Sequence, residues 1–143
     1  MGISKDIIKF AKASNQKVEL VRRRTVIKLF TAVILDTPVD KGLLRGNWQT
    51  SLRKPKTNNL KRKDKSGDAA IRKVLANLGD GSEDVYLTNN LPYARVAEYG
   101  EWKPNTEKVN SAGYSKKAKK GMVRVNLARA AELLRDEINN AKR

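Results

Sequence analysis

The feature that most limits the fold is a long stretch of helical periodicity at the start of the chain. Apolar residues recur every three or four positions over residues 3–35, which predicts one long amphipathic helix, or two helices with a bend near Asn15. From Val26 onward, in VIKLFTAVIL, apolar side chains surround the helix axis, so this half should be buried on several sides. Pro38 disfavours helical geometry at Thr37, so the helix should end there.

Three shorter helices are expected after it. Residues 69–78 predict a helix that Asp68 caps and Gly79 stops. Pro92 should open the helix YARVAEYG, with Gly100 as its stop. In that helix Tyr93, Val96 and Ala97 share one face. The last helix is indicated by the periodic apolar residues Val123, Leu127, Ala130, Leu134, Ile138 and Ala141.

Two strands complete the predicted fold. Residues 47–52, NWQTSL, alternate in polarity and predict a half-buried strand, and residues 85–90, VYLTNN, predict a second. We therefore expect a single α+β domain over residues 1–143: a small antiparallel or mixed sheet packed against a long N-terminal helix and a C-terminal helix, with two long basic loops. A sheet of two strands is marginal unless further strands or neighbouring chains extend it.

The charge balance limits the partners. Lysine and arginine outnumber aspartate and glutamate by 31 to 15, giving a net charge of +16. Such a chain attracts polyanions: nucleic acid, an anionic membrane surface or an acidic protein. A membrane partner is not expected, because no apolar run approaches the roughly 20 residues of a transmembrane helix and the N-terminus has no signal-peptide core.

Most catalytic chemistry is excluded by composition. With no cysteine and no histidine, the chain cannot form disulfides, Cys/His zinc sites or a histidine general base, and we expect no cofactor. One class worth testing is a Mg²⁺-dependent nuclease that uses Asp36 and Asp40. Turn chemistry explains Asp40, and a helix end explains Asp36, so we do not expect an enzyme.

The two basic loops suggest contacts with a polyanion. Residues 53–65 contain seven basic residues against one acidic, and residues 101–120 contain six lysines against two glutamates. Both loops are predicted to be mobile, since they have few apolar residues to bury. Aromatic stacking positions are scarce, which disfavours recognition of RNA or single strands.

Three segments, TPVDKGLLRGNW, NNLPYARVAEYG and GMVRVNLARA, resemble in their order and spacing the tail-completion and neck proteins of long-tailed bacteriophages, the minor tail protein Z-like head-tail connector family. The resemblance spans Thr37 to the last helix, and departs from the family at Lys41, where threonine is more common, and in the basic loop 53–65. It implies a virion structural protein that forms a homo-oligomeric ring at the head-proximal end of the tail and helps head-tail joining around the DNA channel. The alternatives are a free protein that binds double-stranded nucleic acid without sequence specificity and, more weakly, the nuclease.

The resemblance also implies partners and places. The ring is expected to be hexameric, since tail tubes of related phages commonly have sixfold symmetry. Its neighbours would be the tail tube or tail terminator protein, the head-side connector or portal-associated proteins, and packaged double-stranded DNA. The protein would assemble in the host cytoplasm and reside in the neck or tail of the virion.

The candidate functional residues fall into three groups. An assembly motif should hold the turn, the first strand and the short helix in place, and Arg45 with Glu98 is its candidate salt bridge, either inside a subunit or across a ring interface. The loop 53–65 is expected to face the DNA channel, and the loop 101–120 to contact an acidic protein. The assembly residues are Asp40, Gly42, Leu44, Arg45, Trp48, Tyr93, Glu98, Tyr99, Gly100, Met122 and Arg124. The DNA-channel residues are Lys54, Lys56, Lys61, Arg62, Lys63 and Lys65, and the acidic-partner residues are Lys103, Lys108, Tyr114, Lys116, Lys117, Lys119 and Lys120.

Overall fold

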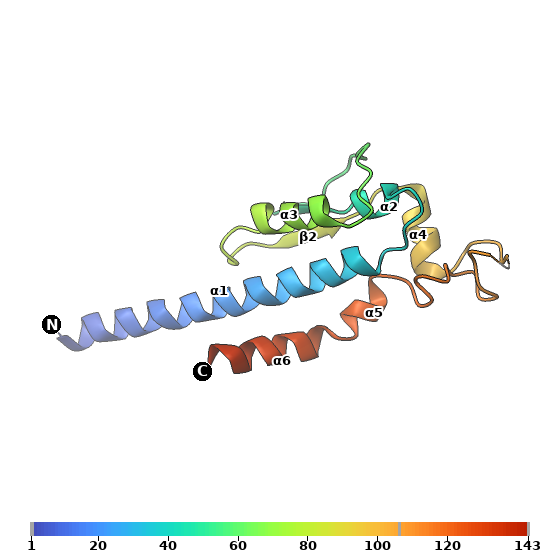
Figure 1. Cartoon of the computed structure of the whole chain (residues 1–143). Helices are drawn as coiled ribbons and strands as arrows, with labels where there is room; N and C mark the ends of the chain where they lie inside the picture. The colour runs from blue at the N-terminus through green and yellow to red at the C-terminus, as the bar shows by residue number, and fades with distance from the viewer. Residues whose placement is uncertain (1, 106, 143) are drawn as a thin grey trace.

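The fold is built on one long helix with a layer on either side. A computed structural model describes residues 2–105 and 107–142. In Figure 1 the long helix α1 lies between a layer of α3 and the sheet and, on its other side, α6. This is the α+β fold that the sequence predicts. The elements in chain order are α1 (Gly2–Asp36), α2 (Leu43–Gly46), β1 (Gln49–Leu52), α3 (Asp68–Asn77), β2 (Val85–Thr88), α4 (Pro92–Tyr99), α5 (Arg124–Leu127) and α6 (Ala130–Ala141).

Helix α1 is continuous over Gly2–Asp36, so of the two predicted alternatives the chain forms the single long helix. It ends before Pro38, where the Thr37 hydroxyl donates to the Val33 carbonyl at 2.8 Å and accepts from Trp48 Nε1 at 2.7 Å. Thr37 and Trp48 are both buried. The end of α1 is therefore tied to the chain that follows it.

Burial around the second half of α1 is less complete than predicted. Ile34 is fully buried and Val33 nearly so, but Leu35 on another face is 48% exposed. The cause is a shallow groove between α1 and α6, whose walls include Ile27, Ala32 and Leu133. Two faces of α1 are covered by other elements, and a third is open.

Strands β1 and β2 form a two-stranded antiparallel sheet in which Gln49 pairs with Thr88 and Leu52 with Val85. Trp48 comes just before β1, so the predicted strand begins two residues too early. The prediction of a half-buried strand is also wrong, because Gln49, Thr50 and Ser51 are all buried. One face of β1 packs towards the core, and residues 53–65 cover the other.

Residues 53–65 do not form the loosely held loop that their composition predicts. The side chain of Asn47 exchanges two hydrogen bonds with the backbone of Leu60, at 2.9 and 2.7 Å. Arg62 Nε donates to the Gly46 carbonyl at 2.8 Å. Composition fails here because polar side chains and backbone groups hold the segment, and apolar burial plays little part.

Asp64, and not the predicted Asp68, caps helix α3. Its carboxylate accepts from the N–H of Gly67 at 3.1 Å and of Ala70 at 2.9 Å, which satisfies two N–H groups that the first turn cannot pair internally. Asp68 lies in the first turn of the helix itself. The basic segment thus ends in the residue that starts the next helix.

The predicted C-terminal helix is two helices, α5 and α6, separated by Ala128 and Arg129. This break turns a different face of α6 towards α1. The buried residue of α6 is Glu137, 3% exposed, which forms an ion pair with Lys28 of α1. Leu134 and Ile138 of the predicted apolar stripe are exposed instead. No described helix is long and apolar enough to cross a membrane.

Replacing Thr37 with valine should lower the free energy of unfolding by about 1–3 kcal/mol, because the buried Trp48 N–H loses its acceptor. Thr25→Val is the matched control. Thr25 makes the same hydrogen bond to the carbonyl four residues earlier, at 2.8 Å, but its hydroxyl accepts none from the residues that the structure describes. Chemical denaturation of both variants measures the difference, and equal losses would contradict the role given to Thr37.

Candidate assembly site

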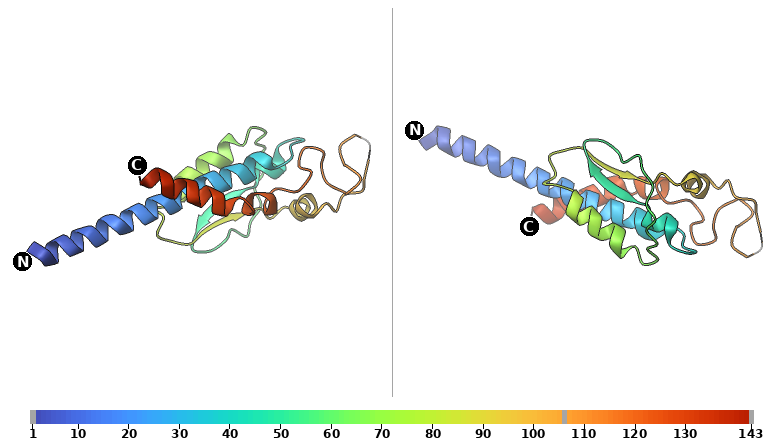
Figure 2. Two further views of the ribbon diagram at one scale, coloured as in Figure 1. Left: turned by 90° about the horizontal axis from the view of Figure 1, so that it is seen from below. Right: turned by 90° about the horizontal axis from the view of Figure 1, so that it is seen from above.

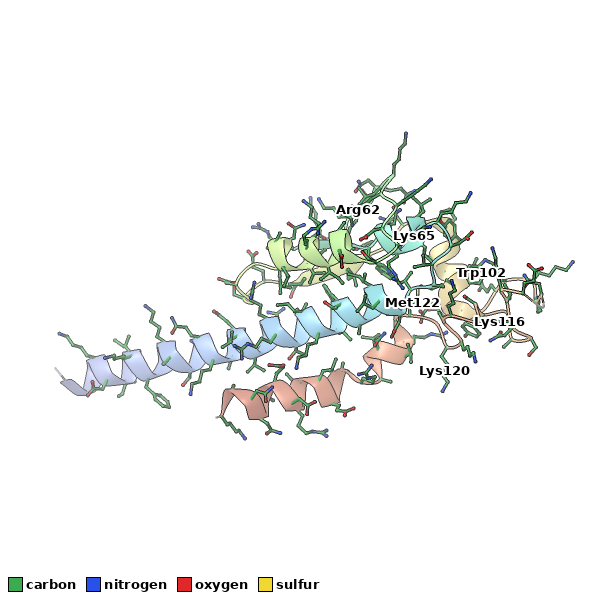
Figure 3. The ribbon with its side chains drawn as sticks, in the orientation of Figure 1. Arg62, Lys65, Trp102, Lys116, Lys120 and Met122 are labelled. Carbon is green, nitrogen blue, oxygen red and sulfur yellow. The ribbon has the colours of Figure 1, made fainter. Side chains whose placement is uncertain are left out.

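The three segments TPVDKGLLRGNW, NNLPYARVAEYG and GMVRVNLARA all contribute side chains to one hydrophobic core. Leu44 and Trp48 from the first segment pack with Ala97 from the second and Met122 from the third, against Ile34 of α1. Segments far apart in the sequence therefore share one buried cluster. Figure 3 shows Met122 near the C-terminal end of α1, close to α4 and α5.

The turn of the first segment is built around Gly42. Its φ of 90° is a conformation that favours glycine, and an added Cβ would lie 2.8 Å from the backbone nitrogen of Lys65. The Gly42 carbonyl accepts from the N–H of both Gly46 and Asp64 at 2.9 Å. The predicted tight turn is confirmed, and it also anchors the end of the basic segment.

Arg45 closes the C-terminal end of α1. Its Nη2 donates to the carbonyls of Leu35 and Thr37 at 2.8 Å, and its Nη1 donates to the Lys65 carbonyl at 2.6 Å. Burial lowers the pKa of Arg45, while the carboxylates of Asp64 and Asp36 oppose that shift. The guanidinium thus binds carbonyl groups that the helix end leaves unpaired.

Glu98 joins the second segment to the third. It is 7% exposed. Its carboxylate accepts from the backbone N–H of Met122, Val123 and Arg124, at 2.7, 2.8 and 3.0 Å, and from Arg124 Nε at 3.0 Å. Within the chain the predicted pair of Arg45 with Glu98 does not form, because Arg124 is the partner of Glu98 and Arg45 binds backbone carbonyls.

The charge on Glu98 is stabilised by these donors. Burial on its own would raise the pKa of Glu98, but the hydrogen bonds from Val123, Arg124 and Met122 outweigh it and the pKa is lowered. The hydrogen bond to Glu98 in turn raises the pKa of Arg124. The pair therefore remains ionised at neutral pH.

The surface beside this pair is formed by aromatic side chains. The Arg124 guanidinium lies 4.4 Å from the centre of the Tyr99 ring, and Arg95 lies 5.2 Å from it on the same tyrosine. Gly100 ends α4 with a φ of 67°, and a Cβ there would lie 2.5 Å from the ring of Tyr114. Tyr114 thus packs against Gly100 and is half-buried, and its predicted contact with a partner stays a prediction.

Five of the eleven residues of the predicted assembly motif are buried, and two more, Arg45 and Gly100, are half-buried. Gly42, Leu44, Trp48, Glu98 and Met122 are buried, and they hold the core together. Tyr93, Val96 and Ala97 share one face of α4 as predicted, but the buried residues of the helix are Ala94, Ala97 and Glu98, so Tyr93 and Val96 lie at the edge of the buried surface. The motif residues that reach the surface are Asp40, Tyr93, Tyr99 and Arg124.

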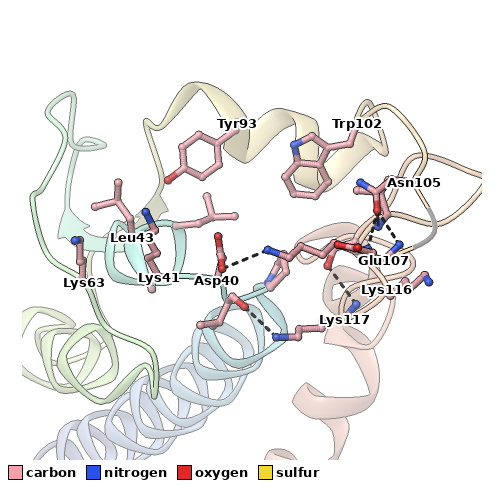
Figure 4. A pocket seen from close by; sticks show the side chains of 17 residues that line it. Asp40, Lys41, Leu43, Lys63, Tyr93, Trp102, Asn105, Glu107, Lys116 and Lys117 are labelled. Carbon is pink, nitrogen blue, oxygen red and sulfur yellow. Dashed lines mark hydrogen bonds and ion pairs between the residues drawn. The ribbon is translucent and has the colours of Figure 1, made fainter.

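A basic groove lies between the first turn and the loop 101–120, with a volume of about 760 Å³. Figure 4 shows Tyr93 and Trp102 on one side of it, and Lys41 and Lys63 towards one end. Leu43, Leu44 and Val109 add apolar surface. Lysines from three separate parts of the chain line it: Lys41, Lys63, Lys108, Lys116 and Lys117.

The loop 101–120 is folded into successive turns, although a flexible loop was predicted. The side-chain oxygen of Asn105 accepts from the N–H of Lys108 at 2.7 Å and of Val109 at 3.1 Å, and that of Asn110 accepts from Tyr114 N–H at 3.0 Å. These asparagine turns fix the groove wall. Of the predicted acidic-partner residues, Lys108, Lys116 and Lys117 line the groove, whereas Lys103, Lys119 and Lys120 are exposed outside its lining.

Sequence reasoning missed Lys41 and assigned Lys63 to the DNA channel. Both line the groove, because the segment 53–65 packs against the turn at Gly42. No local pattern could place them together. The other predicted DNA-channel lysines, at positions 54, 56, 61 and 65, are exposed, while the Arg62 guanidinium is bonded to the carbonyls of Gly46 and Trp48.

The two aspartates considered for metal binding serve different contacts. Asp36 accepts from Asn126 Nδ2 at 2.8 Å, and Asp40 forms an ion pair with Lys108 at 3.7 Å. Within residues 2–105 and 107–142 there is no group of three or more potential metal ligands of the His, Cys, Asp or Glu type. Comparison of the chain with protein-family models, curated proteins and solved structures finds no match.

Replacing Glu98 with glutamine should lower the free energy of unfolding by about 1–3 kcal/mol at neutral pH, because the amide cannot accept all four hydrogen bonds. The pKa of Glu98 is lower in the folded state, so its contribution is complete above the unfolded-state pKa of about 4.3 and is lost as pH falls through the folded value. As the pH falls below the unfolded-state pKa, the free energy of unfolding should therefore decrease less in the variant than in the parent. Denaturation at several pH values measures both effects.

Glu101→Gln is the control for this variant. Glu101 faces Arg95 at 3.4 Å in an exposed pair, which contributes only about 0–1 kcal/mol. A Glu98 variant no less stable than the Glu101 variant would show that the carboxylate does not hold the two segments together.

Proposed function

We propose that this protein is a virion structural subunit that forms a ring at the head-proximal end of a phage tail. The ring completes the tail and helps join it to the head around the DNA channel, with no catalytic step. The resemblance of the three segments to tail-completion and neck proteins supports this proposal, and so does their convergence in one core. A protein that acts by assembling needs no reactive group at its surface. The motif residues fit such a role, because many of them form hydrogen bonds or packing contacts inside the chain.

One observation carries the self-assembly part of the proposal. The first half of α1, residues 2–18, extends beyond the other elements as an arm (Figure 2). Four large apolar side chains on it are widely exposed: Ile7 63%, Ile8 68%, Phe10 74% and Val18 66%. A lone subunit would leave this surface in water, and exposed apolar patches of this kind mark interaction sites.

A second copy of the chain is the occupant that fits the arm. Phe10 lies about five helical turns before Lys28, so the two share the face of α1 that contacts α6 through Glu137. The arm continues this internal helix-helix interface, and the described elements leave it uncovered. Leu134 and Ile138 on α6, 42% and 39% exposed, offer a neighbour a matching apolar surface. Contacts between different faces of identical chains close into rings or extend into filaments.

The exposed lysines of the segment 53–65 suit a DNA channel. Their side chains are solvated while the backbone of the segment is held, so they can contact phosphates weakly and without sequence preference. Lys54, Lys56, Lys61 and Lys65 carry this role in the proposal. The competing function, a free protein that binds double-stranded nucleic acid, has the net charge of +16 in its favour.

Replacing Ile7 and Phe10 with serine should convert the ring to monomers. The fold should hold, because exposed side chains contribute only about 0.5 kcal/mol or less to stability. Sedimentation velocity and electron microscopy, with and without purified tail tubes, measure assembly. Lys5→Ser with Lys12→Ser is the matched control on the opposite face of the arm.

Two outcomes would contradict the proposal. A parent chain that remains monomeric and ignores tail tubes while binding duplex DNA is the free nucleic-acid-binding protein. Rings that form equally well from both double variants would show that the arm does not join the subunits.

Replacing Lys56 and Lys61 with glutamate should weaken duplex DNA binding and reduce the slope of log affinity against log salt by about 0.9 for each phosphate that is no longer neutralised. Ring formation should be unchanged, since both side chains are exposed. Arg72→Glu with Lys73→Glu, on exposed positions of α3, is the control of equal charge. If the Lys56 and Lys61 variant cannot form rings, the segment is an assembly contact and its assignment to DNA is wrong.

A further inference from the structure

We propose that the basic groove binds an acidic segment of a different protein, one that carries an apolar side chain between its carboxylates. The groove has the two surfaces that such a segment needs. Its apolar part is formed by Leu43, Val109 and the ring of Trp102, and its rim carries the lysines. An apolar side chain would occupy the former while the flanking carboxylates reach the latter.

The positive charge of the groove is only partly neutralised within the chain. Lys41 and Lys63 form no hydrogen bond or ion pair with any described residue. Lys108 has a loose exposed pair with Asp40, at 3.7 Å, and Lys117 donates to an uncharged carbonyl, that of Val39, at 3.1 Å. Five lysines line the groove against two acidic residues, Asp40 and Glu107. This excess of charge favours a carboxylate-bearing ligand.

Tyr93 adds a neutral donor to the same groove. Burial raises the pKa of its phenol, so the hydroxyl keeps its proton at neutral pH. Figure 4 shows this hydroxyl directed across the groove towards α2. It can donate to a carboxylate that the lysines attract.

The shape and chemistry of the groove favour a protein ligand over duplex DNA. Phosphates and sugars have no large apolar group to place against Leu43 and Trp102, so a duplex would leave this surface unused or bury it at a loss of hydrogen bonds to water. A segment of polypeptide can supply both kinds of contact. Duplex DNA is thus a competitor to be tested and not the proposed ligand.

A second copy of the chain is a poor occupant. Its densest acidic stretch, Asp80 with Glu83 and Asp84, lies beside arginines: Arg53 faces Glu83 at 3.6 Å, and Arg22 faces Asp84 at 3.8 Å. These arginines cancel much of its negative charge. Under the proposed function, on which this inference rests for the identity of the partner, the segment belongs to a neighbouring tail or head-side protein.

Fluorescence anisotropy with a labelled synthetic peptide tests the proposal. The probe is a short run of aspartate and glutamate with one central leucine, and its reference is the same peptide with serine in place of leucine. The parent chain should bind the leucine peptide about tenfold more tightly, the factor that one apolar side chain contributes. Trp102→Ala should remove that preference while the charge-driven binding of both peptides persists.

Lys41→Glu with Lys63→Glu should weaken binding of the leucine peptide by at least about tenfold. Arg72→Glu with Lys73→Glu, of equal charge and outside the groove, should change it by less than about threefold. Circular dichroism checks the fold of each variant. Equal losses in both charge variants, or no preference for leucine in the parent, would show general attraction to the basic surface and overturn the proposal.

Duplex DNA provides the last discrimination. If it displaces the leucine peptide and its own binding falls equally with Lys41→Glu and Lys63→Glu, the groove binds phosphate and the proposal is wrong. The peptide measurements do not depend on tail assembly. Rings without peptide binding would therefore refute only this inference, and peptide binding by a chain that forms no ring would refute only the proposed function.

Discussion

The rest of the structure depends on how the C-terminal end of α1 is closed. A helix end leaves carbonyl groups without internal partners, and here the chain that follows supplies them with donors. The Arg45 guanidinium donates to the carbonyls of Leu35 and Thr37, and the Trp48 side-chain N–H donates to the Thr37 hydroxyl. Because Arg45 also holds Lys65, one side chain fixes the helix, the first turn and the basic segment together. The groove and the core can form only around this junction.

Glu98 extends the same design to the other half of the molecule. Its carboxylate acts as a cap for the turn that leads into α5, since three consecutive backbone N–H groups point at it. The residues that look most like a functional signature are therefore used to connect segments. Their chemistry is that of buried charge satisfied by hydrogen bonds, which fixes one arrangement of the chain. The residues that surround them on the surface are the ones available to bind partners.

Local rules account for what the sequence predicts correctly. Pro38 and Gly100 mark helix ends through backbone geometry alone. Alternating polarity indicates the first strand, and β-branched and aromatic residues indicate the second. Prediction fails where the partner is distant, since Glu98 meets Arg124 across 26 positions. The groove was missed for the same reason, since its lysines come from three parts of the chain. Prediction also fails close by, where Asp64 caps α3 from six positions before Ala70 although Asp68 lies nearer to the helix start. Composition also misjudged both basic loops, because backbone hydrogen bonds can order a segment that has little to bury.

The segment 53–65 separates two properties that most chains combine. Its main chain takes the structural part, through contacts such as those of Leu60 and Asp64 with Asn47 and Gly42. Most of its lysine side chains have no part in holding the segment in place. Mutation can therefore replace these lysines with little effect on folding. The electrostatic potential of this surface can then change between lineages while the fold stays constant. Arg62 and Asp64, whose side chains bond the backbone of Gly46 and of Ala70, are exceptions within the segment, and we expect them to vary least.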